Sequence, residues 1–119
     1  MKTRLEVLLD NKIISSVIYD FSLMSYETLL GESLKSSSLE VLITHLAMAS
    51  ERIRNGNPVD FMGDDILTAI KEDSDFDDAV RLTELILSKS DIVFPPSETH
   101  FMWLHMVNAL KEDGGENND

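Results

Sequence analysis

The sequence predicts an all-α protein, a bundle of five helices arranged as packed antiparallel pairs, and three observations support this prediction. Apolar residues recur at intervals of three and four along most of the 119 residues. Alternation of apolar and polar residues, which is typical of β-strands, never extends beyond a few positions. Segments rich in glycine, proline or serine divide the chain into stretches of helical length. We expect one domain over residues 1–111, followed by an acidic, disordered tail at 112–119.

The first two helices follow from apolar spacing and from the residues that end them. Apolar side chains at helical spacing predict one long first helix over residues 5–30, since no glycine or proline interrupts it before Gly31. A second amphipathic helix is predicted over 38–54, SLEVLITHLAMASERIR, with a serine as its cap. The sequence Asn-Gly-Asn-Pro at 55–58 is a strong stop signal.

Three further helices are predicted in the second half of the chain. A short one begins at Asp64-Asp65, and another is expected over 77–88 after a cap at Ser74-Asp75. The last begins at Ser97, directly after Pro95-Pro96, and is apolar around most of its circumference. Such a helix is expected in the centre of a bundle or in a dimer interface, and Trp103 is expected to pack there.

Composition excludes several classes of function. The net charge is −12, which disfavours direct binding to nucleic acid or to an anionic membrane and favours partners with positive patches. No apolar run approaches the length of a membrane span, and cysteine is absent, so we expect a cytoplasmic protein without thiolate metal sites. No cofactor is expected. The three histidines do not have the spacing of a metal-binding motif.

Two histidines share a mirrored pattern. His45 lies at the edge of the apolar stripe of its helix, and Arg52 follows seven residues later, about two turns along the same edge. His105 lies seven residues after Glu98 and three before Asn108. If the two helices pack antiparallel, the two edges can face each other, and Arg52 can pair with Glu98 beside the imidazoles.

Two segments around these histidines resemble a known family. THLAMASERIRNG resembles the first, and PPSETHFMWLHMVNA the second, phospho-acceptor segment of the bacterial PTS regulation domain (PRD), in the right order and about sixty residues apart. The resemblance implies that His45 and His105 accept phosphoryl groups from the phosphocarrier HPr or a sugar-specific IIB component, with Arg52, Glu98 and Asn108 supporting the site. It also implies a homodimer that regulates transcription and is not an enzyme.

Two features depart from the family pattern. His100 occupies a position where members usually carry a small residue, which concerns how closely a neighbouring helix packs there. Family domains also commonly occur in pairs behind a nucleic-acid-binding module, whereas this sequence contains one copy and no such module. A stand-alone domain of this kind is therefore expected to act through a partner, or by competing for the phosphoryl donor.

The residues alone leave alternatives open. His45 and His105 can be half-buried structural histidines, and the chain can be an acidic helical dimerisation or protein-interaction module that is never modified. Arg52 and Glu98 can form a structural ion pair rather than a phosphate clamp. A metal-dependent enzyme is a third interpretation, but the adjacent acids at 64–65 and 77–78 fall where helix N-termini favour them anyway.

Overall fold

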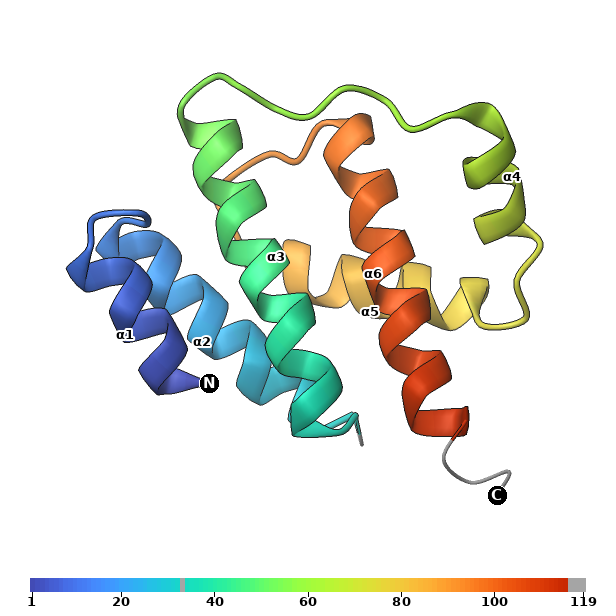
Figure 1. The fold of residues 1–119 in the computed structure, drawn as a ribbon, viewed down its shortest axis with the longest axis horizontal. Coiled ribbons are helices and arrows are strands. Elements are labelled where there is room, and N and C mark those ends of the chain that lie inside the picture. The colour runs from blue at the N-terminus through green and yellow to red at the C-terminus, as the bar shows by residue number, and fades with distance from the viewer. Residues whose placement is uncertain (33, 116–119) are drawn as a thin grey trace.

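The computed structural model describes residues 1–32 and 34–115, and the all-α class is confirmed (Figure 1). The described residues form six helices: α1 (Lys2–Asp10), α2 (Ser16–Leu30), α3 (Ser36–Arg54), α4 (Asp64–Lys71), α5 (Phe76–Leu87) and α6 (Pro96–Gly115). Helix α6 thus includes the first half of the segment expected as a tail, and residues 116–119 of that segment lie outside the described part of the chain.

The prediction of a single long first helix is wrong, because the chain breaks between α1 and α2. Asn11 ends α1, and Lys12 adopts a left-handed backbone conformation with φ of 60°. Ser15 then caps α2, its hydroxyl accepting a hydrogen bond from the Ile18 amide at 3.4 Å. A serine that accepts from the first turn satisfies an otherwise unpaired amide and defines a helix start. Ser15 therefore marks the start of a second helix.

Helix α3 lies between α2 and α6, and it runs antiparallel to α6 (Figure 1). Its apolar stripe is buried against both neighbours, and α6 contributes methionines to the same core. The large apolar side chains that are fully or almost fully buried along these two helices are Leu39, Leu42, Ile43, Leu46, Met102 and Met106. Complete burial of a side chain of this size contributes roughly 1.5–3 kcal/mol. This apolar contact fixes how the polar edges of α3 and α6 meet.

Helix α3 ends as its stop signal predicts. Gly56 has a φ of 77°, which glycine adopts without strain, and its amide donates to the Ile53 carbonyl at 3.0 Å. The Asn57 amide donates to the Arg52 carbonyl at 2.8 Å, so the last turn of the helix is well closed. The chain then crosses at residues 55–63 toward α4 and passes the N-terminal end of α6 (Figure 1).

The remaining helices complete the bundle around α6. Helix α5 crosses α6 at a steep angle (Figure 1). The short α4 packs beside α6, and its Ile70 is buried. The adjacent acids at 64–65 and 77–78 lie in the first turns of α4 and α5, where the helix dipole favours negative charge. Among the described residues, no cluster of acids and histidines has the arrangement of a metal site. None of the described helices is long and apolar enough to cross a membrane.

Candidate functional site

His45 and His105 meet face to face between α3 and α6. Their ring centroids lie 3.9 Å apart and the ring planes differ by 5°, so the imidazoles are stacked. The antiparallel packing of the two helices explains the contact. A step of seven residues forward from His45 reaches Arg52, and the same step backward from His105 reaches Glu98. The helix pair that stacks the histidines therefore also brings the two ionic residues together.

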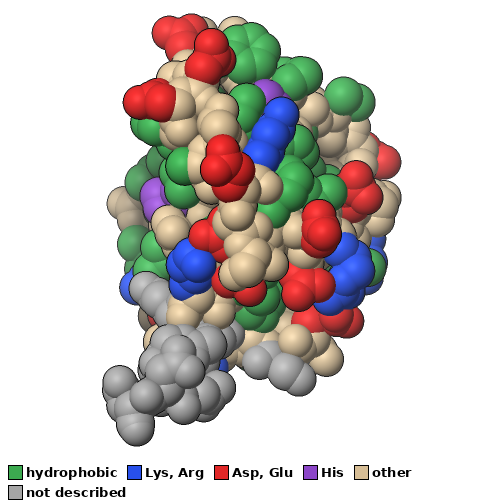
Figure 2. Space-filling view, turned by 90° about the vertical axis from the view of Figure 1, so that its right-hand side faces the viewer, with side chains coloured by type: hydrophobic (Ala, Val, Ile, Leu, Met, Phe, Trp, Pro, Cys, Tyr) green, Lys and Arg blue, Asp and Glu red, His purple; other side chains and the backbone are tan. Residues whose placement is uncertain are grey.

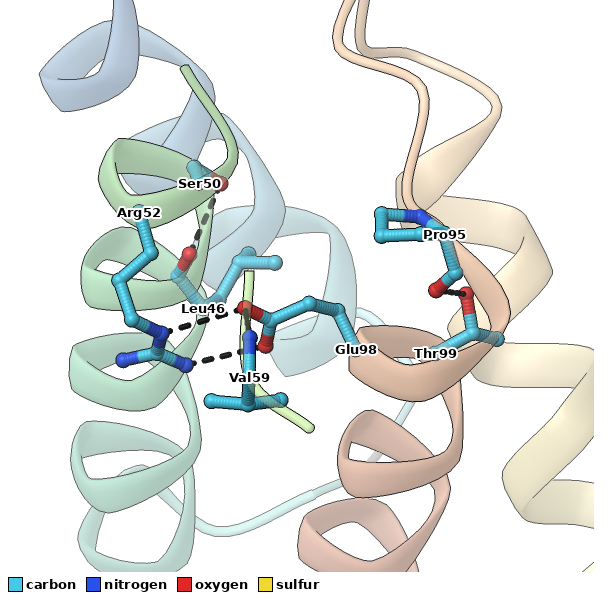
Figure 3. Close-up of polar contacts among 7 residues, drawn as sticks. All are labelled: Leu46, Ser50, Arg52, Val59, Pro95, Glu98 and Thr99. Carbon is cyan, nitrogen blue, oxygen red and sulfur yellow. Dashed lines mark hydrogen bonds and ion pairs between the residues drawn. The ribbon is translucent and has the colours of Figure 1, made fainter. Parts of the chain in front are cut away.

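Arg52 and Glu98 form the ion pair that the spacing indicated (Figure 3). The guanidinium donates from Nε to Glu98 Oε2 at 3.2 Å and from Nη2 to Oε1 at 3.0 Å, and the Val59 amide donates to Oε2 at 3.0 Å. The Glu98 side chain is 0% exposed, whereas that of Arg52 is 39% exposed. A buried carboxylate with three hydrogen bonds is fully committed to these partners. The pair thus fastens α3 and the 55–63 segment to the start of α6.

The stacked histidines open into a pocket of about 440 Å³ between α3 and α6. The His45 side chain is exposed at its rim, and His105 is half-buried deeper between the helices. Asn108 is exposed and lies in the same pocket, as expected for a residue one turn after His105. The described residues that line the pocket are Ser38, Val41, Leu42, His45, His105, Asn108, Ala109 and Lys111.

Burial and neighbouring positive charge keep both imidazoles neutral. Desolvation, together with the charge of Arg52, lowers the pKa of His45. The pKa of His105 falls further, to about 4, through burial first and then through His45 and Arg52. A neutral imidazole has a lone pair on one ring nitrogen, and these two rings meet through their faces. The lowered pKa values thus favour the neutral form of both rings near pH 7.

His100 lies outside this site. Its ring packs against Trp103 at a centroid distance of 4.9 Å and approaches Phe61 at 6.0 Å, on a different side of α6. Trp103 also makes an edge-to-face contact with Phe76 at 5.3 Å, so the tryptophan belongs to the packing between α5 and α6. The bulk of His100 is thus accommodated by aromatic neighbours, and it does not reach the histidine pair.

Lys111 is the pocket residue that sequence reasoning missed. It follows Asn108 by three residues, as Asn108 follows His105, so the same periodicity continued for one more turn leads to it. Its position at the end of the predicted domain concealed this signal. Lys111 also forms an ion pair with Asp73 at 2.9 Å, a contact across the chain that spacing along one helix cannot predict.

In a comparison with family models, residues 22–109 match the model described as PRD domain. The matched region begins within α2 and includes both histidines, Arg52, Glu98 and Asn108. No curated protein matches the chain, and no solved structure matches it either.

Proposed function

The chain belongs to the PRD domain family, and we propose that its stacked histidines receive phosphoryl groups from HPr or from a IIB component of the sugar phosphotransferase system. The family is regulatory and is linked in general to that transport system, and its domains interact with PTS components. The finer assignment, phosphorylation of His45 and His105, rests on the geometry of this chain.

The observation that supports phosphorylation best is the pair of neutral imidazoles in one accessible pocket. In the transfer, the lone pair of an imidazole nitrogen attacks phosphorus and forms an N–P bond. The bond between phosphorus and the donor breaks, and its electron pair stays with the donor. This chain supplies the acceptor and no other chemistry, because the donor carries the activated group. The depressed pKa values of His45 and His105 keep the lone pair available at neutral pH.

The proposed consequence is a change in what the protein binds. A phosphoryl group adds close to two negative charges to a chain whose net charge is already −12. Val41 is 55% exposed and borders the same pocket, so a partner or second copy that covers this apolar side chain also approaches the histidines. Added charge there disfavours an apolar contact and favours a basic one. We infer a switch between dimer states or partners that is transmitted to transcription in the cytoplasm.

Arg52 and Glu98 support the site structurally in this proposal. Their ion pair holds α3 and α6 in the register that stacks the histidines two turns away. In this proposal the guanidinium stays on the buried carboxylate rather than turning toward a phosphate. Asn108, at the rim, has an amide that can donate to a phosphoryl oxygen.

Phosphotransfer tests the proposal directly. The wild type, His45→Gln, His105→Gln and the double variant are incubated with phosphoenolpyruvate, enzyme I and HPr, or with phosphorylated IIB components, and acid-labile phosphate is measured. We expect label on the wild type, a reduced amount on each single variant and none on the double variant. His100→Gln is the matched control, because His100 lies outside the pocket, and it should be labelled like the wild type.

Two outcomes would contradict the proposal. Absence of label on the wild type with HPr and with every IIB component tried would favour the unmodified interaction module instead. Full label on the double variant would move the modification to another residue, with His100 the first to examine.

A further inference from the structure

A cation in contact with a phosphoryl group on His45 or His105 would stabilise it, and Arg52 is already paired with another anion, Glu98. Arg52 already donates two hydrogen bonds to Glu98, whose side chain is 0% exposed. If the guanidinium turned toward a phosphate, this carboxylate would stay buried without its counterion. Such an unpaired buried charge is strongly unfavourable. Arg52 therefore cannot leave Glu98 at low cost, although its charge still acts on both histidines.

Lys111 is the basic residue among the described residues that line the histidine pocket. It belongs to α6, six residues after His105, and its side chain is 51% exposed. Its Nζ lies 2.9 Å from Asp73 Oδ2 and 3.7 Å from Asp75 Oδ2. The hydrogen bond to Asp73 raises the pKa of Lys111, so the ammonium stays charged at neutral pH. A charged lysine on a flexible stem can reach different anions from one backbone position.

Asp73 and Asp75 need Lys111 as a counterion less than Glu98 needs Arg52. Asp73 Oδ1 accepts a hydrogen bond of 2.9 Å from the Asp75 amide, and that bond remains when the lysine leaves. The side chains of Asp73 and Asp75 are 17% and 34% exposed, so water can solvate them. Ion pairs with this much exposure contribute little to stability. Lys111 can therefore move at low cost, whereas Arg52 cannot.

We propose that Lys111 binds the phosphoryl group in the histidine pocket, and that phosphorylation of His45 or His105 draws it away from Asp73 and Asp75. The proposal rests on the proposed function, since it requires a phosphorylated histidine. A phosphoryl group with close to two negative charges competes well against two single carboxylates that are partly hydrated. Lys111 is then a positioning residue, which stabilises the modified state without taking part in the transfer.

The exchange carries the signal to a second part of the molecule. Asp73 and Asp75 form the turn between α4 and α5, and Lys111 ties this turn to α6. When Lys111 moves to the phosphoryl group, the turn loses its ion pairs with α6, and the carboxylates of Asp73 and Asp75 lose their counterion. Acidic side chains are already spread over the face of the molecule on the α4 side (Figure 2). Phosphorylation of the pocket thus makes this face more negative and its turn freer to move.

The first test measures how much phosphate the protein holds at equilibrium with a fixed ratio of phosphorylated to free HPr. We expect Lys111→Gln to hold at least fivefold less than the wild type and Lys111→Arg to recover most of the loss. Asp73→Asn, which weakens the competing ion pair, should hold more than the wild type. Arg81→Gln is the matched control, because Arg81 is also exposed and paired, with Glu32 at 3.2 Å, but does not line the pocket.

The second test follows the amide resonances of Asp73 and Asp75 by NMR before and after phosphorylation. They should shift in the wild type and stay unchanged in Lys111→Gln. Label on Lys111→Gln equal to that on the wild type, or a phosphorylated wild type whose turn resonances do not move, would overturn this inference and leave the proposed function intact. A wild type that takes no label from HPr, from IIB components or from phosphoramidate, which needs no protein docking, would overturn both.

Discussion

The contact between α3 and α6 has two polar regions that differ in burial and in hydrogen bonding. At one end, Arg52 and Glu98 satisfy each other with two hydrogen bonds, and Glu98 is fully buried. Two turns away, His45 and His105 touch only through their ring faces beside an open pocket. The Glu98 carboxylate of the first region is buried against its partners, whereas the imidazoles of the second region border an accessible pocket. Residues with the same seven-residue spacing thus serve structure in one place and are available for chemistry in the other.

The largest expected effect lies in the structural region. Arg52→Ala leaves the Glu98 carboxylate buried without its cation, and we expect a loss of about 3 kcal/mol in the free energy of unfolding, measured with urea. The double variant Arg52→Ala/Glu98→Ala removes the buried charge as well and should be less destabilised than the two single losses together. If Arg52→Ala cost no more than His45→Gln, the distinction between the two regions would be lost.

A smaller loss of stability is expected at low pH, and it arises from the histidine region. The pKa of His105 is lowered to about 4 in the folded protein, below its ordinary value near 6.5, by burial and by the charges of His45 and Arg52. As pH falls below 6.5 the unfolded chain takes up a proton and the folded chain does not, so stability falls with falling pH. Allowing for solvent screening of a half-buried ring, we expect a loss of about 1–2 kcal/mol between pH 7 and pH 4.5.

Urea unfolding of the wild type and of His105→Gln across this pH range measures that effect. The variant should show a flatter dependence, because glutamine does not titrate. Parallel curves for the two proteins would mean that His105 is not the residue responsible.

The smallest effect on stability is expected at Lys111. This residue lines the exposed histidine pocket and, like Arg52, forms an ion pair. Its contacts with Asp73 and Asp75 are solvent-exposed, so Lys111→Gln should leave the Tm unchanged within the scatter of the measurement. Thermal unfolding followed by circular dichroism tests this expectation. A marked drop in the Tm would place Lys111 with Arg52 as a structural residue and would weaken its role as a movable phosphate ligand.

The sequence predicted those site residues that the antiparallel register of α3 and α6 brings together. Seven residues correspond to nearly two helical turns, so His45 with Arg52 and Glu98 with His105 mark one edge on each helix. Antiparallel packing then pairs them without further information. Lys111 was missed because it lies at the end of the predicted domain, and its ion pair with Asp73 in the turn between α4 and α5 could not be predicted from spacing along α6.

The sequence predicted the helices except at the break between α1 and α2, which contains neither glycine nor proline. The chain turns between α1 and α2 through the left-handed backbone of Lys12, a residue with no special preference for that conformation. The local signal was Ser15, whose hydroxyl caps α2, but a serine within an apolar pattern equally suits a continuous helix. In the observed fold, Ile14 in the connection and Ile18 on α2 are both buried in the core.

The family signature and the folding unit have different boundaries in this chain. The matched region begins at residue 22, yet Leu5, Ile14 and Ile18, all before it, are 0–2% exposed within the same core as α3. Arg4 on α1 also reaches α3, where its Nη1 donates to Thr44 Oγ1 at 3.3 Å. A fragment cut at the matched boundary would lose these core side chains and Phe21 as well, and would expose the apolar surface they cover. The regulatory motif is therefore shorter than the polypeptide that must fold to present it.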